Sequence, residues 1–401
     1  MSNQTQTYGD LVATLTSEFD WSWNDEGSGA SSDGTFWLAK SQGNKSLRPL
    51  GSLAVNHHNG INNEMAMLLL GDSFANRAKP PVANPIDYKP LWNDAGTGSK
   101  HDGSFWRPVA PPGFTACGDV CWPGRGKPPL DIIWCLRNDL TNDGGYKSAQ
   151  TWDDTDSGAS NDASFWDVIP TTQSSSSELI PTFAGTFRFS TNYSPPQTSL
   201  AKVPCLFVPK RDKPFPVYPP PVTAANLPEQ NDSFSETITG TVTLPFTAFF
   251  DPNDRACLDN IANPFCTIHK KVSWIVLKRE TNPTDKAVTK KQIVHVGVKD
   301  SVAKTMEHSV GVSISTEVGL LAKFSVTMNY QFSYSETKIQ EETREKTIEE
   351  PIDIPPYSVT LLWGRRIELL GERADGTRIG GGMMYTANEV VPVPVSVPPR
   401  T

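Results

Sequence analysis

Three copies of one short template restrict how this chain can fold more than any other feature. Each copy has a Trp, an Asp two residues later, a Ser/Thr-Gly pair, a second Asp eight residues after the first, and a closing Phe-Trp pair. The copies are WNDEGSGASSDGTFW from Trp23, WNDAGTGSKHDGSFW from Trp92 and WDDTDSGASNDASFW from Trp152. Repeated units of this kind bury their apolar faces against one another. We therefore expect three small sheets around one shared core.

The residue types of the template indicate a hairpin. Ser/Thr-Gly supplies a position with positive φ, and Asp side chains hydrogen-bond local backbone amides. The tryptophan rings are expected to close the core, with their indole N–H groups bonded near its rim. The Asp residues therefore have a turn-stabilising role in this interpretation.

A functional interpretation of the same template remains open beside the structural one. The paired Asp residues and the closing Trp can contact a sugar or another surface receptor. Two carboxylates with loop carbonyls are too few to specify calcium, so no metal site is predicted. The candidate ligand-binding residues are Asp25, Asp33, Trp37, Asp94, Asp102, Trp106, Asp154, Asp162 and Trp166.

The composition indicates an all-β protein. The 401 residues include 34 prolines and 29 glycines, and no long stretch has helical periodicity. The formal net charge of −8 leaves no basic stripe to neutralise phosphates, so nucleic acid is not an expected partner. The longest wholly apolar run, Met65–Leu70, is too short for a membrane-spanning helix, so any insertion has to use strands.

A proline-rich stretch divides the chain. Residues 212–230 read DKPFPVYPPPVTAANLPEQ, which is typical of a stiff, extended connector. We expect a threefold-repeat binding domain over residues 1–211, a connector over 212–231 and an elongated β domain over 232–401. The second domain contains long alternating segments, and its last residues carry alternate prolines, which are confined to an edge strand or a tail.

The most regular alternation runs from Ser309 to Ser335, SVGVSISTEVGLLAKFSVTMNYQFSYS. Its even positions are almost all apolar, aromatic or small, so a strand here has one oily face and one polar face. A bend at 319–322 gives two arms of roughly ten residues, about the length a tilted strand needs to cross a bilayer. In a membrane-inserting hairpin the lipid-facing residues would be Val310, Val312, Ile314, Val318, Leu320, Phe324, Val326, Met328, Tyr330, Phe332 and Tyr334. The alternative is a long strand pair covering one side of an ordinary sandwich.

The sequence shows no catalytic signature, so neither an enzyme nor a cofactor is expected. No histidine lies in HExxH or another metal spacing, and no G-x-S-x-G elbow precedes a helix. The pair His57-His58 lies in a polar loop and is expected to be solvated. Among the six cysteines, 117 and 121 are expected in the core, whereas a bridge between Cys257 and Cys266 remains open.

The amino terminus has no basic start and no apolar stretch, so it is not expected to be a secretory signal peptide. We expect the protein to be made in the cytoplasm of the producing cell and to act elsewhere after release.

The middle repeat carries a family resemblance. Its Ser104–Gly124, SFWRPVAPPGFTACGDVCWPG, followed by KPPLDIIWCLRNDL, resembles the vacuolar protein sorting protein 62 family over about residues 20–210. The first copy has Gly51-Ser52 where Gly118-Asp119 stands. The third replaces FWRP by residues 165–168, FWDV. The three template copies predict a threefold β-prism-like domain, and the resemblance adds that some domains of this family are similar to insecticidal proteins.

The second half resembles another class. An amphipathic Ser/Thr-rich hairpin, a charged Thr-rich strand and then IPPYSVTLLW resemble the aerolysin and epsilon-toxin/mosquitocidal-toxin β-pore-forming proteins over about residues 232–380. This resemblance implies that the hairpin detaches and that several protomers combine their hairpins into one barrel. The expected function is therefore an insecticidal pore-forming toxin, with the target-cell membrane, a surface receptor or glycan, and further copies of itself as partners. The alternatives are a non-penetrating lectin-like protein and a trafficking or scaffold protein.

Overall fold

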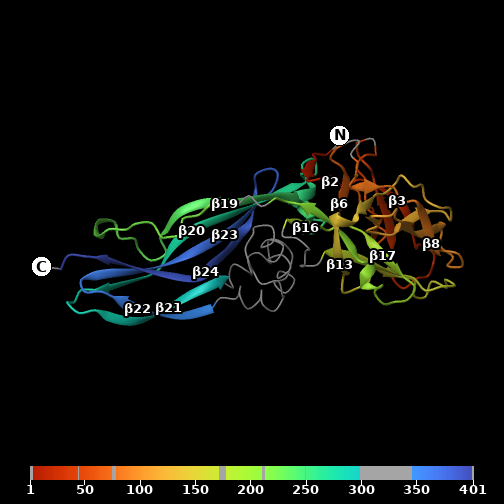
Figure 1. The fold of residues 1–401 in the computed structure, drawn as a ribbon. Coiled ribbons are helices and arrows are strands. Elements are labelled where there is room, and N and C mark those ends of the chain that lie inside the picture. Colours follow the sequence, from red (N-terminus) through yellow and green to blue (C-terminus); the bar gives the residue numbers. More distant parts are fainter. Residues whose placement is uncertain are drawn as a thin grey trace. The chain divides into compact units, whose positions relative to one another are not determined.

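The computed structural model describes residues 3–43, 45–74, 78–170, 178–209, 213–248, 250–298 and 346–399. These residues are nearly all β, which confirms the predicted fold class (Figure 1). The chain divides into two compact units. Unit 1 comprises Met1–Pro209 and Leu244–Cys266, and unit 2 comprises Lys210–Thr243 and Thr267–Thr401. The predicted boundaries, with a connector over residues 212–231 between two independently folding domains, stay a prediction.

Each template copy contributes a set of three antiparallel strands to unit 1. The Trp begins or lies in the first strand, the Phe-Trp pair lies in the second, and a later segment supplies the third. The three sets are β3 (Phe19–Asn24), β4 (Thr35–Ala39) and β5 (Leu53–Val55); β8 (Asp87–Asn93), β9 (Gly103–Val109) and β11 (Val120–Pro123); and β14 (Trp152–Asp153), β15 (Ser164–Pro170) and β17 (Phe187–Ser190). The first two predicted small sheets are therefore separate, whereas the third is part of a six-stranded sheet, because β15 also pairs with β13 (Thr141–Tyr146).

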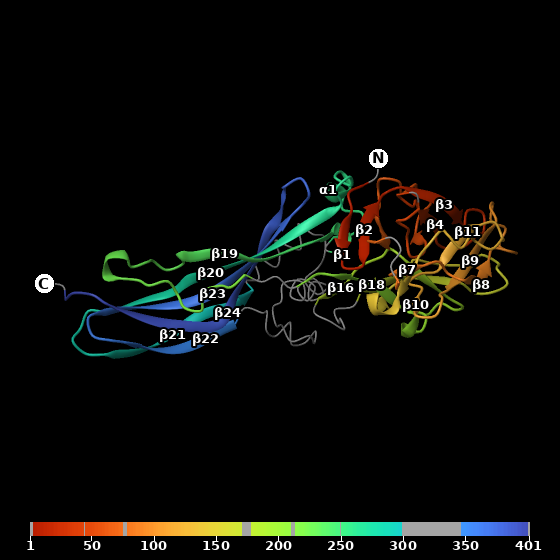
Figure 2. The ribbon, with the colours of Figure 1, turned by 45° about the horizontal axis from the view of Figure 1, so that its top comes forward.

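A second strand set accompanies these template sheets, as Figure 2 shows for β1, β2, β7 and β10. Its strands are β1 (Gln6–Tyr8), β2 (Leu11–Thr16) and β6 (Met67–Asp72); β7 (Val82–Ala83), β12 (Cys135–Arg137) and β10 (Phe114–Thr115); and β13 (Thr141–Tyr146), β18 (Lys202–Phe207) and β16 (Leu179–Pro181). Short 3-10 turns lie at Asn138–Leu140, Thr198–Leu200, Ala224–Asn226 and Phe246–Ala248.

The three template sheets share one aromatic core. Its threefold set consists of the first Trp and the closing Phe of every copy: Trp23, Trp92, Trp152, Phe36, Phe105 and Phe165. Neighbouring rings meet mostly edge to face, for example Phe36 and Phe105 with centroids 4.6 Å apart. Edge-to-face pairs of this kind add to the stabilisation from burial alone.

The indole N–H groups join each repeat to the next in a closed ring. Nε1 of Trp23 donates to the carbonyl of His101 at 2.8 Å, and Nε1 of Trp92 donates to that of Asn161 at 2.9 Å. Nε1 of Trp152 closes the ring by donating to the carbonyl of Ser32 at 2.8 Å. Each acceptor directly precedes the second template Asp. The expectation that indole N–H groups bond at the core's rim is confirmed for the first Trp of each copy, whose partner always belongs to another repeat, but not for the closing Trp37, whose buried Nε1 has no partner among the described residues.

Strand alternation separates the two residues of the Phe-Trp pair. Because successive side chains point to opposite faces, the Phe enters the shared core while the Trp points the other way. Trp37 packs with Phe19 and Met67, and Trp106 packs with Tyr88 and Ile133. The first two template sheets are thus apolar on both faces.

A buried ion cluster joins the second and third repeats. Asp119 is fully buried and accepts hydrogen bonds from both Arg107 (3.0 and 2.8 Å) and Arg188 (2.8 Å). Burial opposes ionisation of Asp119, but the charges of Arg188 and Arg107 prevail and lower its pKa. Arg107 and Asp119 belong to the FWRP and GDV motifs, so these two motifs meet in one ion pair.

The residues between β19 and β20 return to unit 1. β19 (Ser233–Pro245) and β20 (Phe265–Asn282) flank a segment that holds the single α-helix of the described chain, α1 (Arg255–Leu258). The N–H of Gln4 donates to the carbonyl of Ala262, and that of Ala66 donates to Pro252, both at 2.8 Å. The sulfurs of Cys257 and Cys266 lie 4.0 Å apart in this segment, buried and unbridged.

Unit 2 is one sheet of long strands in the order β19-β20-β23-β24-β21-β22. Its remaining strands are β21 (Val288–Val298), β22 (Lys346–Ile354), β23 (Ser358–Glu372) and β24 (Arg378–Ser396). Figure 1 shows β20, β23 and β24 running side by side. Trp274, Leu361 and Trp363 fill the core on one face of this sheet.

The predicted insertion hairpin, 309–335, lies outside the described residues. Its connections are described: β21 ends at Val298, β22 begins at Lys346, and the two strands are antiparallel neighbours, with Val296 opposite Lys346. Within the described ranges, no helix is long and apolar enough to cross a membrane.

Candidate functional site: three equivalent aspartate clusters

The first Asp of each template copy is buried and closes the hairpin. Asp25, Asp94 and Asp154 are only 3–4% exposed. Each carboxylate accepts the N–H of the residue nine positions later. The distances are 2.8 Å from Gly34, 3.2 Å from Gly103 and 2.9 Å from Ala163. The turn-stabilising interpretation is therefore correct for the first Asp.

The template turns adopt the predicted backbone. The Gly of each Ser/Thr-Gly pair has positive φ: 77° at Gly29, 77° at Gly98 and 72° at Gly158. Two residues earlier, the first two copies have another glycine of positive φ, whereas the third places Asp156 there at 68°. This conformation costs a non-glycine residue energy, although Asp tolerates it better than most residues.

A third side chain joins the two Asp residues in every repeat. In the first, His58 Nε2 lies 2.6 Å from Asp25 and 3.9 Å from Asp33. In the second, Arg125 contacts Asp94 at 3.2 Å and Asp102 at 3.0 Å. In the third, the Tyr193 hydroxyl lies 3.2 Å from Asp154 and 3.4 Å from Asp162. We call these groups the first, second and third aspartate clusters.

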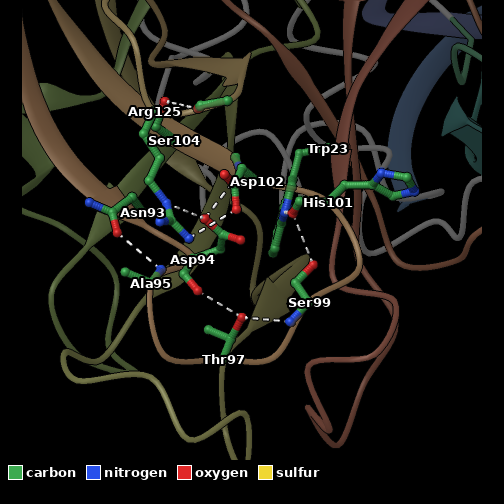
Figure 3. A network of polar contacts seen from close by, with 12 residues as sticks. Trp23, Asn93, Asp94, Ala95, Thr97, Ser99, His101, Asp102, Ser104 and Arg125 are labelled. Atoms are coloured by element: carbon green, nitrogen blue, oxygen red, sulfur yellow. Dashed lines mark hydrogen bonds and ion pairs between the residues drawn. The ribbon is translucent and has the colours of Figure 1, made fainter.

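Figure 3 shows the second aspartate cluster from close by. Arg125 reaches both carboxylates, and Trp23 of the first repeat donates to His101 beside Asp102. Thr97 and Ser99 complete the turn: the Thr97 hydroxyl donates to the Asp94 carbonyl and accepts the N–H of Ser99. The single positive charge of Arg125 offsets one of the two carboxylate charges in this cluster.

The third aspartate cluster differs in charge. Two carboxylates face a neutral phenol, and Asp162 is exposed. Burial raises the pKa of Asp154, and the neighbouring charge of Asp162 acts in the same direction. Hydrogen bonds from the Ala163 N–H and the Tyr193 hydroxyl oppose that rise. Its carboxylates are hydrogen-bond acceptors of the kind that sugar hydroxyls satisfy.

The closing tryptophans do not line the aspartate clusters. Trp37, Trp106 and Trp166 are 8%, 9% and 6% exposed. Trp106 and Trp166 donate to the hydroxyls of Ser104 and Ser164, at 2.8 and 2.9 Å. The Ser104 hydroxyl in turn donates to the carbonyl of Gly124, which precedes Arg125. Trp106 is thus connected to the second aspartate cluster through Ser104 and Gly124.

The bridging residues His58, Arg125 and Tyr193 were missed by the sequence interpretation. His58 was expected to be solvated, and it is exposed, but its ring is also paired with the buried Asp25, which was not predicted. A signal was present, because His58 and Arg125 each follow a Gly, Gly51 or Gly118, by seven residues. The described ranges contain no group of three or more His, Cys, Asp or Glu side chains placed to hold a metal ion.

The fold and these clusters define a threefold-repeat β protein with a separate long-stranded sheet. The family model described as vacuolar protein sorting-associated protein 62 matches residues 2–214. The chain belongs to this family. No curated protein matches it.

Three solved structures are similar to parts of the chain. GNIP1Aa from Chromobacterium piscinae is 22% identical with a TM-score of 0.39, over 47% of this chain and 35% of its own. Cry35Ab1 is 10% identical with a TM-score of 0.29, over 78% of this chain and 89% of its own. The oligomeric pore-forming toxin pro-Monalysin is 7% identical with a TM-score of 0.22, over 32% of this chain and 61% of its own. The chain thus spans about a third of the length of GNIP1Aa, and similarities at this level carry no inference about function.

Proposed function

We propose that this protein is a pore-forming toxin. Unit 1 binds the surface of a target cell, several copies assemble, and residues 309–335 insert as two strands of a shared barrel. The eleven apolar residues from Val310 to Tyr334 named above face lipid, because a barrel wall alternates lipid-facing and lumen-facing side chains. Among the candidate template residues, the exposed Asp33, Asp102 and Asp162 contribute acceptors for recognition of the cell surface.

The observation that carries the proposal is where this stretch joins the sheet. Residues 299–345 leave β21 and return to its antiparallel neighbour β22, so both ends of the stretch start from one strand pair. That pair lies at the edge of the sheet. In the described register, β21 is joined to β24 by Gly297 opposite Thr386 and Val298 opposite Tyr385. An edge pair has a neighbouring strand on one side only, so its release breaks one ladder and the packing of Val294, Ile352 and Ile354 on Leu362.

Two engineered disulfides test this proposal. Opposed residues of an antiparallel pair have Cα atoms about 4.5–5.5 Å apart, within the range that a disulfide spans. Gly297→Cys with Thr386→Cys ties β21 to β24, and His295→Cys with Thr347→Cys ties β21 to β22. Dye release from liposomes of target-cell lipid is measured with each variant, oxidised and reduced.

The first disulfide is expected to abolish dye release until it is reduced, because the strand pair cannot leave the sheet. The second joins the two arms to each other and is expected to leave release unchanged, which makes it the matched control. Equal leakage from the oxidised Gly297/Thr386 variant would show that this strand pair does not move. A wild-type protein that binds susceptible membranes without leakage or oligomers would leave the lectin-like alternative, which the aspartate clusters also favour.

A further inference from the structure

A bulge in the first template sheet exposes one tryptophan. Trp21 is opposite Trp37, but Trp23 is opposite Phe36, so the register shifts between them. Trp23 is fully buried, whereas Trp21 is 38% exposed. The second sheet has the same shift between Pro90 and Trp92, and the third template has Gln150 two residues before its Trp. Only the first copy therefore places an indole at this position.

Trp21 lines a groove between residues of the first and second repeats. The groove has a volume of about 440 Å³, within the range of small-molecule sites. Leu38, Trp122 and Ile132 also line it, and these three pack on the buried cluster of Tyr88, Trp106, Val120 and Ile133. The apolar part of the groove is consequently fixed to the core rather than formed by loose surface side chains. We call this space the Trp21 groove.

Two ion pairs border the Trp21 groove. Lys40 lies 3.5 Å from Asp20, and Lys45 lies 2.9 Å from Asp131. All four side chains are between 45% and 69% exposed. Surface pairs with this exposure add little to stability. They do provide two acceptors and two donors at the edge of an aromatic surface, and their charges sum to zero.

Trp21 contributes little to the packing of the fold. It belongs to none of the buried clusters described above, and its aromatic contact is an edge-to-face one with His101, at 5.2 Å between ring centroids. A partly exposed indole on a rigid surface with adjacent polar groups is typical of a binding site rather than of a core.

We propose that the Trp21 groove binds a neutral saccharide. The apolar face of one pyranose ring packs against Trp21 and Trp122, and its hydroxyls exchange hydrogen bonds with Asp20, Lys40, Lys45 and Asp131. A ligand with a strong net charge would meet one repelling partner for each attracting one, so the balanced border favours an uncharged polyhydroxylated ligand. This inference rests on the proposed function, in which unit 1 recognises a cell surface, and it identifies the saccharide as what unit 1 recognises there.

The test uses the full-length protein and soluble sugars, with no membrane present. Saturation-transfer NMR against the methyl glycosides of mannose, galactose, glucose and N-acetylglucosamine identifies the best probe, and titration gives its Kd. Trp21→Ala is expected to weaken binding at least tenfold. Asp131→Asn, which keeps the shape of the groove, is expected to weaken it several-fold. Phe74→Ala is the control, because Phe74 is 71% exposed and does not line the groove.

Several results would overturn the assignment. Absence of saturation transfer from all four glycosides would exclude saccharide binding, and unchanged Kd values for both Trp21→Ala and Asp131→Asn would exclude this groove. If Tyr193→Phe abolishes binding while Trp21→Ala does not, the sugar binds at the third aspartate cluster. Thermal melting of each variant separates loss of binding from loss of the fold. Because dye release is measured separately on liposomes, the failure of pore formation leaves these sugar titrations interpretable.

Discussion

At the scale of single residues, the three aspartate clusters have chemically different side chains at one equivalent position. In each repeat, one side chain contacts both template Asp residues from the same position. These side chains are His58, Arg125 and Tyr193. The hydrogen bond from the backbone to the first Asp is the same in all three copies, so the turn does not depend on the bridging residue. The bridging residue instead decides which group contacts each buried carboxylate: an imidazole, a guanidinium or a neutral phenol.

This difference predicts unequal effects for two matched substitutions. Asp94→Asn removes the charged partner of Arg125 and is expected to lower the free energy of unfolding by about 1 kcal/mol at neutral pH, since that pair is partly exposed. Asp154→Asn removes a carboxylate whose pKa burial raises, so it is expected to cost less or to stabilise. Urea unfolding of both variants measures the comparison, and equal losses would contradict it.

The pH dependence at Asp154 follows from the direction of its pKa shift. A carboxyl whose pKa is raised in the folded state stabilises the fold below its unfolded pKa, and this contribution is lost as pH rises through the folded value. As the pH rises through the folded-state pKa of Asp154, the free energy of unfolding of the wild-type protein should therefore fall relative to that of Asp154→Asn. The free energies of unfolding of both proteins are measured as a function of pH. If the two curves stay parallel, burial does not destabilise the Asp154 carboxylate.

At the scale of the template hairpin, the return strand begins against an indole from another repeat. A Cβ added to Gly34 would lie 2.4 Å from the ring of Trp152, and one added to Gly103 would lie 2.3 Å from that of Trp23. The third copy has Ala163 at the equivalent position. The first two copies therefore need glycine for close approach, and the third does not.

We predict that Gly103→Ala is strongly destabilising. The added methyl group cannot fit unless Trp23 moves, and Trp23 is fixed by its bond to His101 and by the shared core. Overpacking of this kind typically costs about 1–3 kcal/mol. The converse substitution, Ala163→Gly, is the control and should cost roughly 0.5–1 kcal/mol. Urea unfolding gives both values, and a smaller loss for Gly103→Ala than for Ala163→Gly would refute the close packing.

The sequence predicted those elements whose signals are local. Template spacing predicted the three sheets, the turn glycines and the backbone role of the first Asp, because all of these contacts lie within one hairpin. The bridging residues come from beyond the third strand of each sheet, and the bulge that exposes Trp21 depends on pairing with β4. The spacing of His58 and Arg125 from Gly51 and Gly118 was the one local signal for the bridging residues, and the bulge has none in a short window of sequence. The fit of the FWRP arginine to the GDV aspartate was equally invisible until the strands were paired.

At the scale of the whole molecule, sequence order and compact units do not coincide. The segment 244–266 follows the proline-rich connector in sequence, yet it packs in unit 1. Its residues Phe246, Leu258 and Phe265 are buried, and backbone hydrogen bonds tie it to Gln4 and Ala66. The composition-based boundary at residue 211 cannot reveal this, because no change in residue usage marks a segment that returns to an earlier part of the fold.

This arrangement predicts that a fragment ending at the connector is incomplete. Residues 1–211 alone would leave the surfaces around Gln4 and Ala66 without their partners from 244–266, so the fragment should unfold at a lower temperature than a version that keeps the segment. The comparison version joins residues 1–209 to 244–266 through a flexible linker in place of 210–243. Its Tm is expected to be higher by on the order of 10 °C, because several buried apolar side chains and backbone hydrogen bonds are restored. Substituting Ala for Phe246 and Leu258 in the linked version should remove most of that gain, since it keeps the chain length but not the packing. If the two fragments melt together, segment 244–266 contributes nothing to unit 1, and the boundary at residue 211 is sufficient to define a folding domain.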